Sequence, residues 1–352
     1  MTGTDNRLRV VAAVPLREDL CRMIEELEPR VEMIRDPALL PPMRGPADWA
    51  GDPDYARTPS AQQAFDELVD SADALFGIPD VDPEALARTV AANPRLRWVM
   101  TTAAGGGATV KAAGLDRADL DRIVFTTSAG VHGGPLAEFA VFGVIAGAKN
   151  LPRLLADQRD RTWPDRWEMR QLDEMTVLVV GLGGIGAECA RRFHALGARV
   201  WGTTRSGEPV AGVDRLVPLD ELVDAVAQVD AIVVTLPGTA QTHHLIGRDV
   251  LAAVRRGAIL ASVGRGSVID EAELIGALDD GRIGFAALDV FEQEPLSDDS
   301  PLWGHPSVLV SPHTAALSSK EEERIARRFA ENAARLLDGE PLTAVVDTVE
   351  FY

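Results

Sequence analysis

The chain has 352 residues, enough for two domains with a sizeable core. Its 46% hydrophobic and 25% charged residues are ordinary for a globular protein, and its formal net charge of -19 argues against binding to nucleic acid or to an anionic membrane. The chain shows no apolar leader, no run of transmembrane length and no metal-ligand spacing. Cys21 and Cys189 fit buried thiols, so we expect a cytoplasmic protein without a metal.

The first third of the chain alternates between strand and helix patterns, as an α/β domain does. A helix should begin at Pro83, because Asp82 is a good cap residue and Pro is favoured at the first helical position. Segment Asp36–Ser60 is rich in Pro and Gly, which predicts a long surface loop or a lid. The other elements expected here are strands over Leu8–Val14, Ala74–Phe76 and Trp98–Met100 and a helix over Leu16–Leu27.

A run of small residues, Ala104-Gly105-Gly106-Gly107, closely follows the strand at Trp98–Met100. Three consecutive glycines fit a flexible turn. They fit equally well a nest of backbone N–H groups that holds an anion such as a carboxylate. The spacing alone does not decide between the two interpretations.

The strongest local signal is the turn Gly181-Leu182-Gly183-Gly184-Ile185-Gly186. The apolar strand Val177–Val180 leads into it, a helical pattern leads out of it to about Ala195, and a second apolar strand begins at Val200. This is the start of a βαβ unit with a G-x-G-x-x-G turn, whose glycines permit a tight turn, close approach of a pyrophosphate, and close packing of helix on strand. The helix N-terminus offers free N–H groups to the phosphates, so we predict a dinucleotide site.

Strands and helices continue to alternate after this turn, which predicts a doubly wound parallel sheet. Before the turn, Leu136–Ala148 is an almost wholly apolar helix that is too short to span a bilayer, so it should be a buried connector between domains or subunits. The last helix, Lys320–Leu337, has one apolar face and should pack on the first third of the chain. The further strands expected are Ala231–Thr235, Ala258–Ser262, Phe285–Val290 and Val308–Val310.

Three polar residues, Arg265, Glu294 and His313, come shortly after strands of this sheet, where open α/β sheets bind their ligands. Taken singly, each fits an ordinary structural role. Together they are the parts that reduction of a 2-oxo acid needs. The Arg can bind a carboxylate through two hydrogen bonds, the His can donate a proton to the carbonyl oxygen, and the carboxylate beside the His favours the charged imidazole.

Five motifs in this order resemble the D-2-hydroxyacid dehydrogenases, a family that includes glyoxylate/hydroxypyruvate reductases and phosphoglycerate dehydrogenases. The match is strong over about 129–316 and loose over the first third. The chain differs from many members at Ser262, where an Asn is common, and in the extra glycine of its 104–107 loop. The motifs are Val179–Gly186, Leu236-Pro237 with Thr239 and Thr242, Gly264-Arg265-Gly266 with Val268 and Asp270, Leu288–Pro295, and Ser311-Pro312-His313.

The resemblance implies two Rossmann-like domains with doubly wound parallel sheets and an active site in the interdomain cleft. Residues 1–131 and 318–352 would form the substrate domain, and residues 132–317 the dinucleotide domain. It also implies a homodimer that acts on a small 2-oxo/2-hydroxy acid. Arg265 would bind the substrate carboxylate together with Ala104–Gly107, His313 would be the general acid/base, and Glu294 would pair with His313. Cofactor contacts would come from the glycine-rich turn at Gly181–Gly186 and from Leu236, Pro237, Thr242 and Asp289.

The second strand of the βαβ unit ends in Thr204-Arg205-Ser206, which bears on the choice of cofactor. NAD-binding units carry an acidic residue here for the ribose 2′-OH, and by comparison with the family Thr204 occupies that position. Without the carboxylate, Arg205 can bind a 2′-phosphate while Thr204 and Ser206 donate hydrogen bonds to it. We therefore expect NADP(H) to be favoured. The alternative is a surface Arg with NAD(H) bound less specifically, and Glu208 as a candidate ribose partner.

Other residues receive structural interpretations. His132 should be structural at the domain hinge, and His243 and His244 should begin a helix after Thr242. Trp163 and Trp167 should pack locally, with contact to a neighbouring subunit as the alternative. The competing hypothesis for the whole chain is a dinucleotide-sensing co-regulator with little turnover. A smaller alternative is oxidation of formate or phosphonate on the same scaffold. The sequence does not name the substrate.

Overall fold

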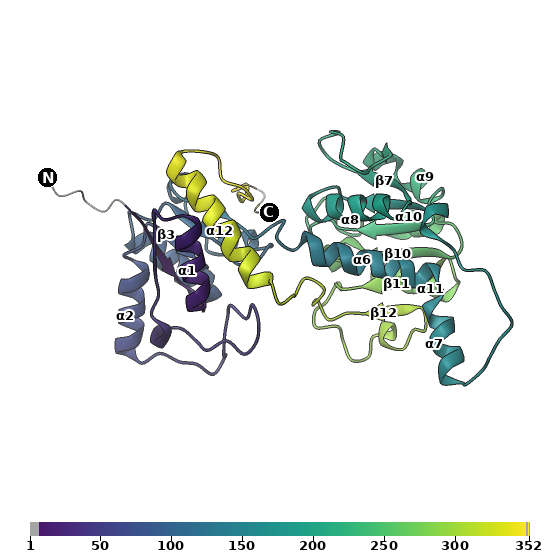
Figure 1. Cartoon of the computed structure of the whole chain (residues 1–352), viewed down its shortest axis with the longest axis horizontal. Coiled ribbons are helices and arrows are strands. Elements are labelled where there is room, and N and C mark those ends of the chain that lie inside the picture. Colours follow the sequence, from purple (N-terminus) through teal and green to yellow (C-terminus); the bar gives the residue numbers. More distant parts are fainter. Residues whose placement is uncertain (1–6, 350, 352) are drawn as a thin grey trace. The chain divides into compact units, whose positions relative to one another are not determined.

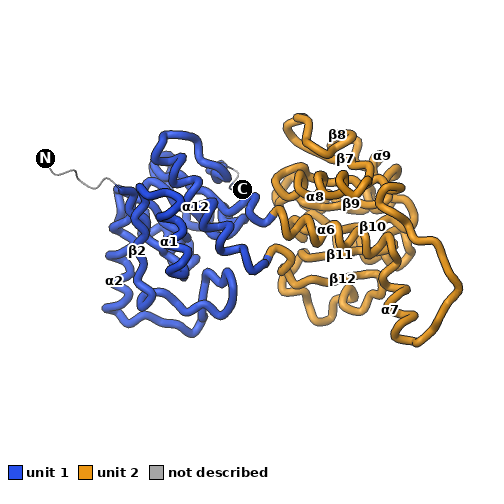
Figure 2. The backbone as a smooth tube through the Cα atoms, in the orientation of Figure 1, with its two compact units in different colours: residues 1–132, 317–352 blue, residues 133–316 orange. Residues whose placement is uncertain are grey.

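The computed structural model describes residues 7–349 and residue 351. The chain divides into two compact units (Figure 2): unit 1 is Met1–His132 with Leu317–Tyr352, and unit 2 is Gly133–Ala316. The chain thus leaves unit 1 and returns to it at positions one residue away from the predicted boundaries.

Unit 1 contains, within the described residues, a five-stranded parallel sheet in the order β2-β1-β3-β4-β5. Buried parallel strands are apolar on both faces because helices cover both. α1 and α12 cover one face, and α2 and α3 contribute to the core on the other (Figure 1). The strands are β1 Leu8–Ala12, β2 Val31–Ile34, β3 Ala74–Phe76, β4 Trp98–Met100 and β5 Val124–Thr126, and the helices are α1 Glu18–Leu27, α2 Pro59–Val69, α3 Pro83–Ala92, α4 Gly107–Ala112, α5 Arg117–Arg122 and α12 Glu321–Asp338, with short 3-10 turns η1 Pro37–Leu39 and η2 Pro79–Val81.

The last helix packs on the first third of the chain, as predicted. Ile325, Phe329 and Ala333 of α12 are fully buried at helical spacing, and Leu336 is partly buried in the same cluster. The Phe329 ring stacks on Trp98 of β4, with ring centroids 4.3 Å apart. The apolar stripe of α12 therefore completes the core of unit 1. The predicted cap of α3 is also confirmed, because Asp82 accepts a hydrogen bond from the Glu84 backbone N–H.

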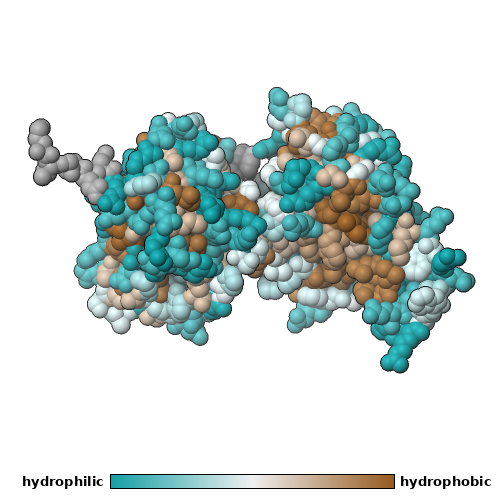
Figure 3. Space-filling view, viewed as in Figure 1, coloured by the Kyte–Doolittle hydropathy of each residue, from teal (hydrophilic) through white to brown (hydrophobic). Residues whose placement is uncertain are grey.

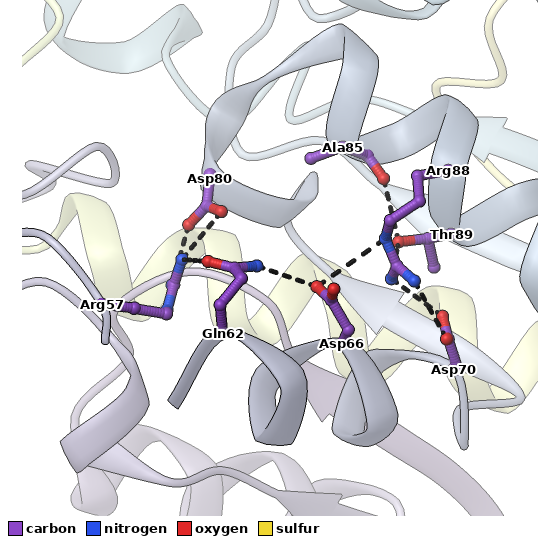
Figure 4. A network of polar contacts seen from close by, with 8 residues as sticks. All are labelled: Arg57, Gln62, Asp66, Asp70, Asp80, Ala85, Arg88 and Thr89. Atoms are coloured by element: carbon purple, nitrogen blue, oxygen red, sulfur yellow. Dashed lines mark hydrogen bonds and ion pairs between the residues drawn. The ribbon is translucent and has the colours of Figure 1, made fainter. Parts of the chain in front are cut away.

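The Pro/Gly-rich segment 36–60 lies on unit 1 and is anchored at several points. Trp49 packs on Phe76 with ring centroids 5.8 Å apart, and the Ala47 N–H donates to Glu322. Near its end, the nearly buried Arg57 binds both oxygens of Asp80 at 2.8 and 2.9 Å (Figure 4). The network in Figure 4 continues through Gln62 and Asp66 of α2 to Arg88 of α3, so it fastens this segment and two helices together.

Unit 2 holds, among the residues described, a seven-stranded sheet in the order β12-β11-β10-β9-β6-β7-β8, and every strand pair is parallel. The strand order reverses at β6, so the predicted doubly wound sheet is confirmed. The strands are β6 Thr176–Val180, β7 Arg199–Thr203, β8 Arg215–Leu216, β9 Ala231–Val234, β10 Ala258–Ser262, β11 Ile283–Leu288 and β12 Val308–Val310, and the helices are α6 Gly133–Ala148, α7 Leu151–Arg159, α8 Gly184–Ala195, α9 Leu222–Val226, α10 Arg248–Ala253 and α11 Glu271–Asp279, with 3-10 turns η3 Leu172–Glu174, η4 Leu219–Glu221, η5 Gly266–Val268 and η6 Pro301–Trp303.

The apolar helix α6 lies on one face of this sheet beside α8 (Figure 1). A Cβ on Gly143 would lie 2.5 Å from the Cβ of Ala287, so this glycine permits close approach to β11. The outer side of α6 is less covered, since Phe142 is 49% exposed. Across the part of the chain that the structure describes, no single helix has both the length and the apolar composition needed to cross a membrane, and α6 with α7 reaches them only as a pair bent by 65°.

Candidate active site

The glycine-rich turn begins where β6 ends. Gly181 has φ +103°, a conformation that side chains disfavour, and two threonines fix its peptide groups. Its N–H donates to the Thr203 hydroxyl at 2.9 Å, and its carbonyl accepts from the Thr235 hydroxyl at 2.6 Å. β7 and β9, the strands on either side of β6, thereby hold the turn in place.

The helix α8 begins immediately after this turn and can hold a pyrophosphate. A Cβ on Gly186 would lie 2.0 Å from the Gly181 carbonyl oxygen, so only glycine allows the helix to start here. A Cβ on Gly183 would meet no atom within 4 Å, so the space beside this residue is open. The first N–H groups of a helix have no partner within the helix, so those of Gly184, Ile185 and Gly186 point at that space with the positive end of the helix dipole.

The loop after β9 lies between the glycine-rich turn and the Arg265 loop. Leu236 fills the position that a Cβ on Gly181 would take, and its carbonyl oxygen fills the position that a Cβ on Gly264 would take. The Thr242 hydroxyl donates to the Pro237 carbonyl at 2.6 Å and closes the loop on itself. The loop is thus shaped for close contact with a ligand above the turn.

The prediction that His243 and His244 begin a helix is wrong. Both lie in a turn, and α10 begins only at Arg248. His244 has φ +51° and its backbone N–H donates to the carbonyl of Ser267 at 2.9 Å. The positive φ of His244 takes the backbone out of the helical region, and the bond to the neighbouring η5 segment holds it there.

Thr204, Arg205 and Ser206 follow β7 directly, as the sequence predicts. The hydroxyls of Thr204 and Ser206 are 3.2 Å apart, and Ser206 also accepts from the Glu208 backbone N–H at 3.2 Å. Arg205 and Ser206 are exposed. The side chain nearest along the chain that carries a negative charge is that of Glu208.

The loops after β11 and β12 bring Glu294 and His313 together. His313 Nδ1 lies 2.6 Å from Glu294 Oε2, and the side chains are 45% and 34% exposed. The other oxygen of Glu294 accepts from the Phe291 N–H at 3.0 Å, and the His313 N–H donates to the carbonyl of Asp289. The carboxylate and the imidazole are therefore held by their own backbone loops while both remain open to solvent.

Arg265 lies on the loop after β10, the strand next to β11 in the sheet. A Cβ on Gly266 would lie 1.8 Å from the Phe291 carbonyl oxygen, which shows how closely this loop approaches the loop that carries Glu294. The Arg265 guanidinium donates to the carbonyl of Gly264 at 2.9 Å. The three predicted catalytic residues thus lie on adjacent loops at the carboxyl edge of one sheet.

Asp289 has a buried carboxylate oxygen that finds no partner within the described residues. Its Oδ1 accepts from the Ser311 hydroxyl at 2.5 Å and from the N–H groups of Thr314 and Ala315, while Oδ2 accepts nothing, although the residue is only 1% exposed. The nearby Ser262 hydroxyl, where the family often has Asn, is likewise buried without a partner in the described chain. An unpartnered buried acceptor suits a ligand that brings an N–H group.

The predicted substrate loop, Ala104–Gly107, belongs to unit 1. Ala104 and Gly105 are exposed, whereas Gly106 and Gly107 are buried, and α4 begins at Gly107. A Cβ on Gly106 would collide with the Thr101 side chain, and one on Gly107 with the carbonyl oxygen of Phe351. The last two glycines are therefore required by local packing. His132, also in unit 1, is buried with its Nε2 atom 2.9 Å from Glu321.

A doubly wound parallel sheet with a glycine-rich turn at its first crossover defines the class of dinucleotide-binding domains. The comparisons with known proteins specify the family. The model for the D-isomer-specific 2-hydroxyacid dehydrogenase NAD-binding domain matches residues 141–315. Glyoxylate/hydroxypyruvate reductase A of Salmonella dublin is 33% identical over 267 residues, which cover 74% of this chain and 83% of the relative.

Solved structures agree with this assignment over nearly the whole chain. The crystal structure of a D-isomer-specific 2-hydroxyacid dehydrogenase from Xanthobacter autotrophicus Py2, in complex with NADPH and MES, is 29% identical with a TM-score of 0.76, and the match covers 99% of this chain and 100% of that one. An NADPH-dependent glyoxylate/hydroxypyruvate reductase from Sinorhizobium meliloti, at 24% identity, shares the fold with a TM-score of 0.74.

The chain therefore belongs to the D-isomer-specific 2-hydroxyacid dehydrogenase family. It is an NAD(P)-dependent oxidoreductase that transfers a hydride between a nicotinamide cofactor and a 2-oxo acid/2-hydroxy acid pair. This confirms the family and the reaction class predicted from the sequence.

Proposed function

We propose that this enzyme is an NADPH-preferring 2-oxo acid reductase that works reversibly on the D-2-hydroxy acid, with Arg265, Glu294 and His313 as its catalytic residues. The contact of His313 Nδ1 with Glu294 at 2.6 Å, on loops adjacent to that of Arg265, carries the proposal. With Nδ1 facing the carboxylate, the imidazole presents Nε2 to a substrate, and Glu294 fixes the orientation of the ring.

The roles of the three side chains follow from the charge that develops during reduction. When bound, a reduced nicotinamide would supply the hydride that the carbonyl carbon of the 2-oxo acid accepts. Arg265 binds the substrate carboxylate and orients the carbonyl. His313 gives its Nε2 proton to the carbonyl oxygen as negative charge develops there, and it takes the proton back in the oxidative direction. The N–H groups of the loop at 104–107 would share the carboxylate.

The cofactor fits the residues on the carboxyl edge of unit 2. The N-terminal N–H groups of α8 beside Gly183 would hold the pyrophosphate, with Leu236, Pro237 and Thr242 on the other side. The unpartnered Oδ2 of Asp289 would accept a hydrogen bond from the carboxamide of the nicotinamide ring. In this arrangement the buried Oδ2 atom of Asp289 would gain a hydrogen-bond donor only when the cofactor binds.

The cofactor preference rests on the end of β7. Thr204, Arg205 and Ser206 offer a cation and two hydroxyls to a 2′-phosphate, and the NADPH complex of the Xanthobacter relative supports the same choice. We expect the wild type to show higher kcat/KM with NADPH than with NADH, and Arg205→Ala to erode that preference mainly by raising the KM for NADPH. Equal or better catalytic efficiency of the wild type with NADH would overturn the preference and would direct attention to Glu208.

The experiment that tests the function is steady-state turnover with each reduced cofactor against glyoxylate, hydroxypyruvate, pyruvate, phenylpyruvate and branched 2-oxo acids. We expect reduction of at least one of them at a rate ordinary for an enzyme, on the order of 1 per second or more. Tight cofactor binding without turnover of any of them would favour a co-regulator instead. The same assay in reverse, with the two enantiomers of the product, tests the stereochemistry.

We also propose that the enzyme is a homodimer and that α6 and α7 carry the contact surface. Apolar surface gathers over α6 of unit 2 (Figure 3), where a shallow groove of about 470 Å³ is lined by Val141, Phe142, Ile145 and Leu196 among others. Trp163, after α7, is 97% exposed. Light scattering should give a dimeric mass, and Phe142→Glu should give a monomer, whereas Val223→Glu, on the similarly exposed α9, should leave the dimer intact. A monomeric wild type would overturn this proposal.

A cytoplasmic location stays a prediction. Cys21 and Cys189 are both free and buried, and burial raises the pKa of Cys21 to about 11 and that of Cys189 to about 12. Inert buried thiols support a reducing compartment. Fractionation of producing cells would test this, and recovery of the enzyme outside the cytoplasmic fraction would refute it.

A further inference from the structure

A cluster of titratable side chains lies beside the catalytic loops and has no role in the proposed mechanism. It joins three loops of unit 2: the loop after β9 through His244, the start of α11 through Asp270 and Glu271, and the loop after β11 through Glu292. We call these four residues the loop clasp. Glu292 is only two residues before Glu294 in the chain, so the clasp bears directly on the catalytic pair.

His244 is the centre of the clasp. Its Nε2 contacts Glu292 Oε1, and its Nδ1 lies 3.6 Å from Asp270 Oδ2. The His243 ring stacks on it with ring centroids 3.9 Å apart, which restricts the rotation of the His244 side chain. Backbone hydrogen bonds from His244 to Ser267 and from Ile246 to Val268 hold the residue against the η5 segment. Contacts other than the one with Glu292 therefore also restrain His244.

Glu271 and Glu292 exchange hydrogen bonds between side chain and backbone. The Glu292 N–H donates to Glu271 Oε1 at 2.5 Å, and the Glu271 N–H donates to Glu292 Oε2 at 3.3 Å. This reciprocal pair of hydrogen bonds fixes the start of α11 relative to the loop after β11. The cost is that two carboxylates lie side by side.

The charges around the clasp explain why an imidazole is needed there. Glu292 and Glu294 both place negative charge near Glu271, and Asp270 and Glu292 both contact His244. Burial, with repulsion from Glu292 and Glu294, raises the pKa of Glu271 above its ordinary value. The nearby Arg248 is paired with Glu273 at 2.7 Å, and its charge acts on Asp270 only at longer range. His244 is the side chain of the clasp that contacts two of these carboxylates, those of Asp270 and Glu292.

Glu292 and Glu294 are linked by a short and constrained stretch of backbone. The Phe291 N–H donates to Glu294 Oε1, and the Phe291 carbonyl packs against Gly266. A shift of Glu292 therefore moves the backbone that holds Glu294, and Glu294 would move relative to His313. Misplacement by about 1 Å can cost a reaction up to about a hundredfold in rate.

We propose that His244 is a positioning residue for the reaction: through Glu292 it holds the loop that keeps Glu294 against His313. This inference rests on the proposed roles of Glu294 and His313. The alternative is that the clasp only stabilises the fold.

The test compares His244→Ala and His244→Gln with the wild type under saturating NADPH, using whichever 2-oxo acid the wild type reduces best. We expect His244→Ala to lower kcat about tenfold, within the range for misplaced catalytic groups, while both KM values stay within about twofold. The rate of reduction should fall at a lower pH than in the wild type, because an imidazole without a nearby carboxylate loses its proton more readily. His244→Gln should recover part of kcat, because its amide can still donate to Glu292.

Two reference variants make the result decisive. Arg248→Ala removes a similarly placed ion pair that joins α10 to α11 but does not touch the loop after β11, and it should leave kcat and the pH profile unchanged. Glu294→Gln should shift the pH profile in the same direction as His244→Ala, and further. Should His244→Ala fold poorly, Glu292→Gln, which keeps the shape of the side chain, should show the smaller version of the same shift.

The outcomes separate the two proposals. If Glu294→Gln shifts the profile and both His244→Ala and Glu292→Gln overlay the wild type, the positioning role is overturned while the catalytic pair stands. A loss of thermal stability or of kcat in His244→Ala without a shift of the profile also overturns it, because that is the signature of a merely structural role. If Glu294→Gln itself overlays the wild type, the proposed catalytic pair is wrong and the positioning role falls with it.

Discussion

The two units have the same architecture but use their charged residues differently. Each is a parallel sheet with helices on both faces. In unit 1 a polar network, centred on Arg57 and Arg88, fastens α2, α3 and the 36–60 segment to one another (Figure 4). In unit 2 one group of charged pairs, His244 with Asp270 and Glu292 and His313 with Glu294, joins loops at the carboxyl edge of the sheet, while other pairs, such as Arg192 with Glu188, lie on the helices. The comparison teaches that the fold alone does not separate scaffold from chemistry, whereas the position of the charged pairs does.

This comparison leads to a simple expectation. Breaking a charged pair on the carboxyl edge of unit 2 should change rate constants, and breaking one in the network of unit 1 should change the free energy of unfolding. His313→Ala and Arg265→Ala test the unit 2 side of that difference and Arg57→Ala tests the unit 1 side, while Glu271→Gln tests the charge balance within the loop clasp.

The largest effect should come from His313→Ala. Loss of the general acid should lower kcat at least about a hundredfold, because general acid–base catalysis contributes at least that much. The KM for NADPH should change little, since the imidazole is assigned to the substrate. Turnover measured with saturating cofactor and substrate provides the check, with cofactor titration as the control for folding. A variant that turns over near the wild-type rate would show that His313 is not the proton donor.

Arg265→Ala should act mainly on substrate capture. The loss of a charge-assisted contact, about 2 kcal/mol, predicts a rise of about 30-fold in the KM for the 2-oxo acid. Arg265→Lys should recover only part of it, because an ammonium group cannot reproduce the two parallel hydrogen bonds of a guanidinium. Initial rates across a range of substrate concentrations would show this. Full rescue by Lys would mean that the contact needs only a charge.

Arg57→Ala probes the other side of the comparison, in unit 1. Asp80 loses both hydrogen bonds from the guanidinium and Phe65 loses the cation packed 3.8 Å from its ring centre. We expect a loss of about 1.5 kcal/mol, at the low end for charged hydrogen bonds because Asp80 is 32% exposed. Denaturant unfolding measures it, and kcat at saturation should remain that of the wild type. A large fall in kcat without loss of stability would break the distinction between the units.

Glu271→Gln should give the smallest effect, and it should raise the free energy of unfolding, whereas Arg57→Ala lowers it. Because burial and neighbouring carboxylates raise the pKa of Glu271 in the folded state, its ionised form destabilises the protein as pH rises through that pKa. Gln keeps the acceptor for the Glu292 N–H and carries no charge. At neutral pH the variant should be more stable by a few tenths of a kcal/mol, the scale of like-charge pairs, and the gain should vanish below the ordinary pKa of Glu. Melting temperatures at pH 7 and pH 4 compare the two. A gain that is equal at both would show that charge is not its cause.

The sequence predicts the strands best and the loops least. Short strands such as Ala74–Phe76, Trp98–Met100 and Ala258–Ser262 have their predicted bounds, because strands buried on both faces are continuous apolar runs. Elements such as α4, α5 and β8 carry too few residues for a period to show. The prediction for His243 and His244 is wrong for a tertiary reason, since His244 has φ +51°, outside the helical region, and its ring contacts Asp270 and Glu292 from other parts of the chain.

The candidate site was predicted unevenly for the same reason. The resemblance to a family brought His313 and Glu294 together before any coordinates, and the structure places them in contact. The loop clasp was missed, because its hydrogen bonds join residues far apart in the chain and leave no local pattern. One signal was present, since His244, Glu271 and Glu292 each follow a predicted strand of one parallel sheet, and the carboxyl ends of such strands share an edge.

The close approach of Gly266 to the Phe291 carbonyl has a practical meaning for engineering. A library that varies Gly266 would produce chains in which the loops after β10 and β11 cannot pack together, because even a methyl group at Gly266 collides with the backbone of Phe291. In unit 1, a side chain at Gly106 or Gly107 would likewise collide with neighbouring atoms, while Ala104 and Gly105 are exposed. Under the proposed role of this loop in binding the substrate, substitutions at these two exposed positions are the starting point for redesigning which 2-oxo acid the enzyme accepts.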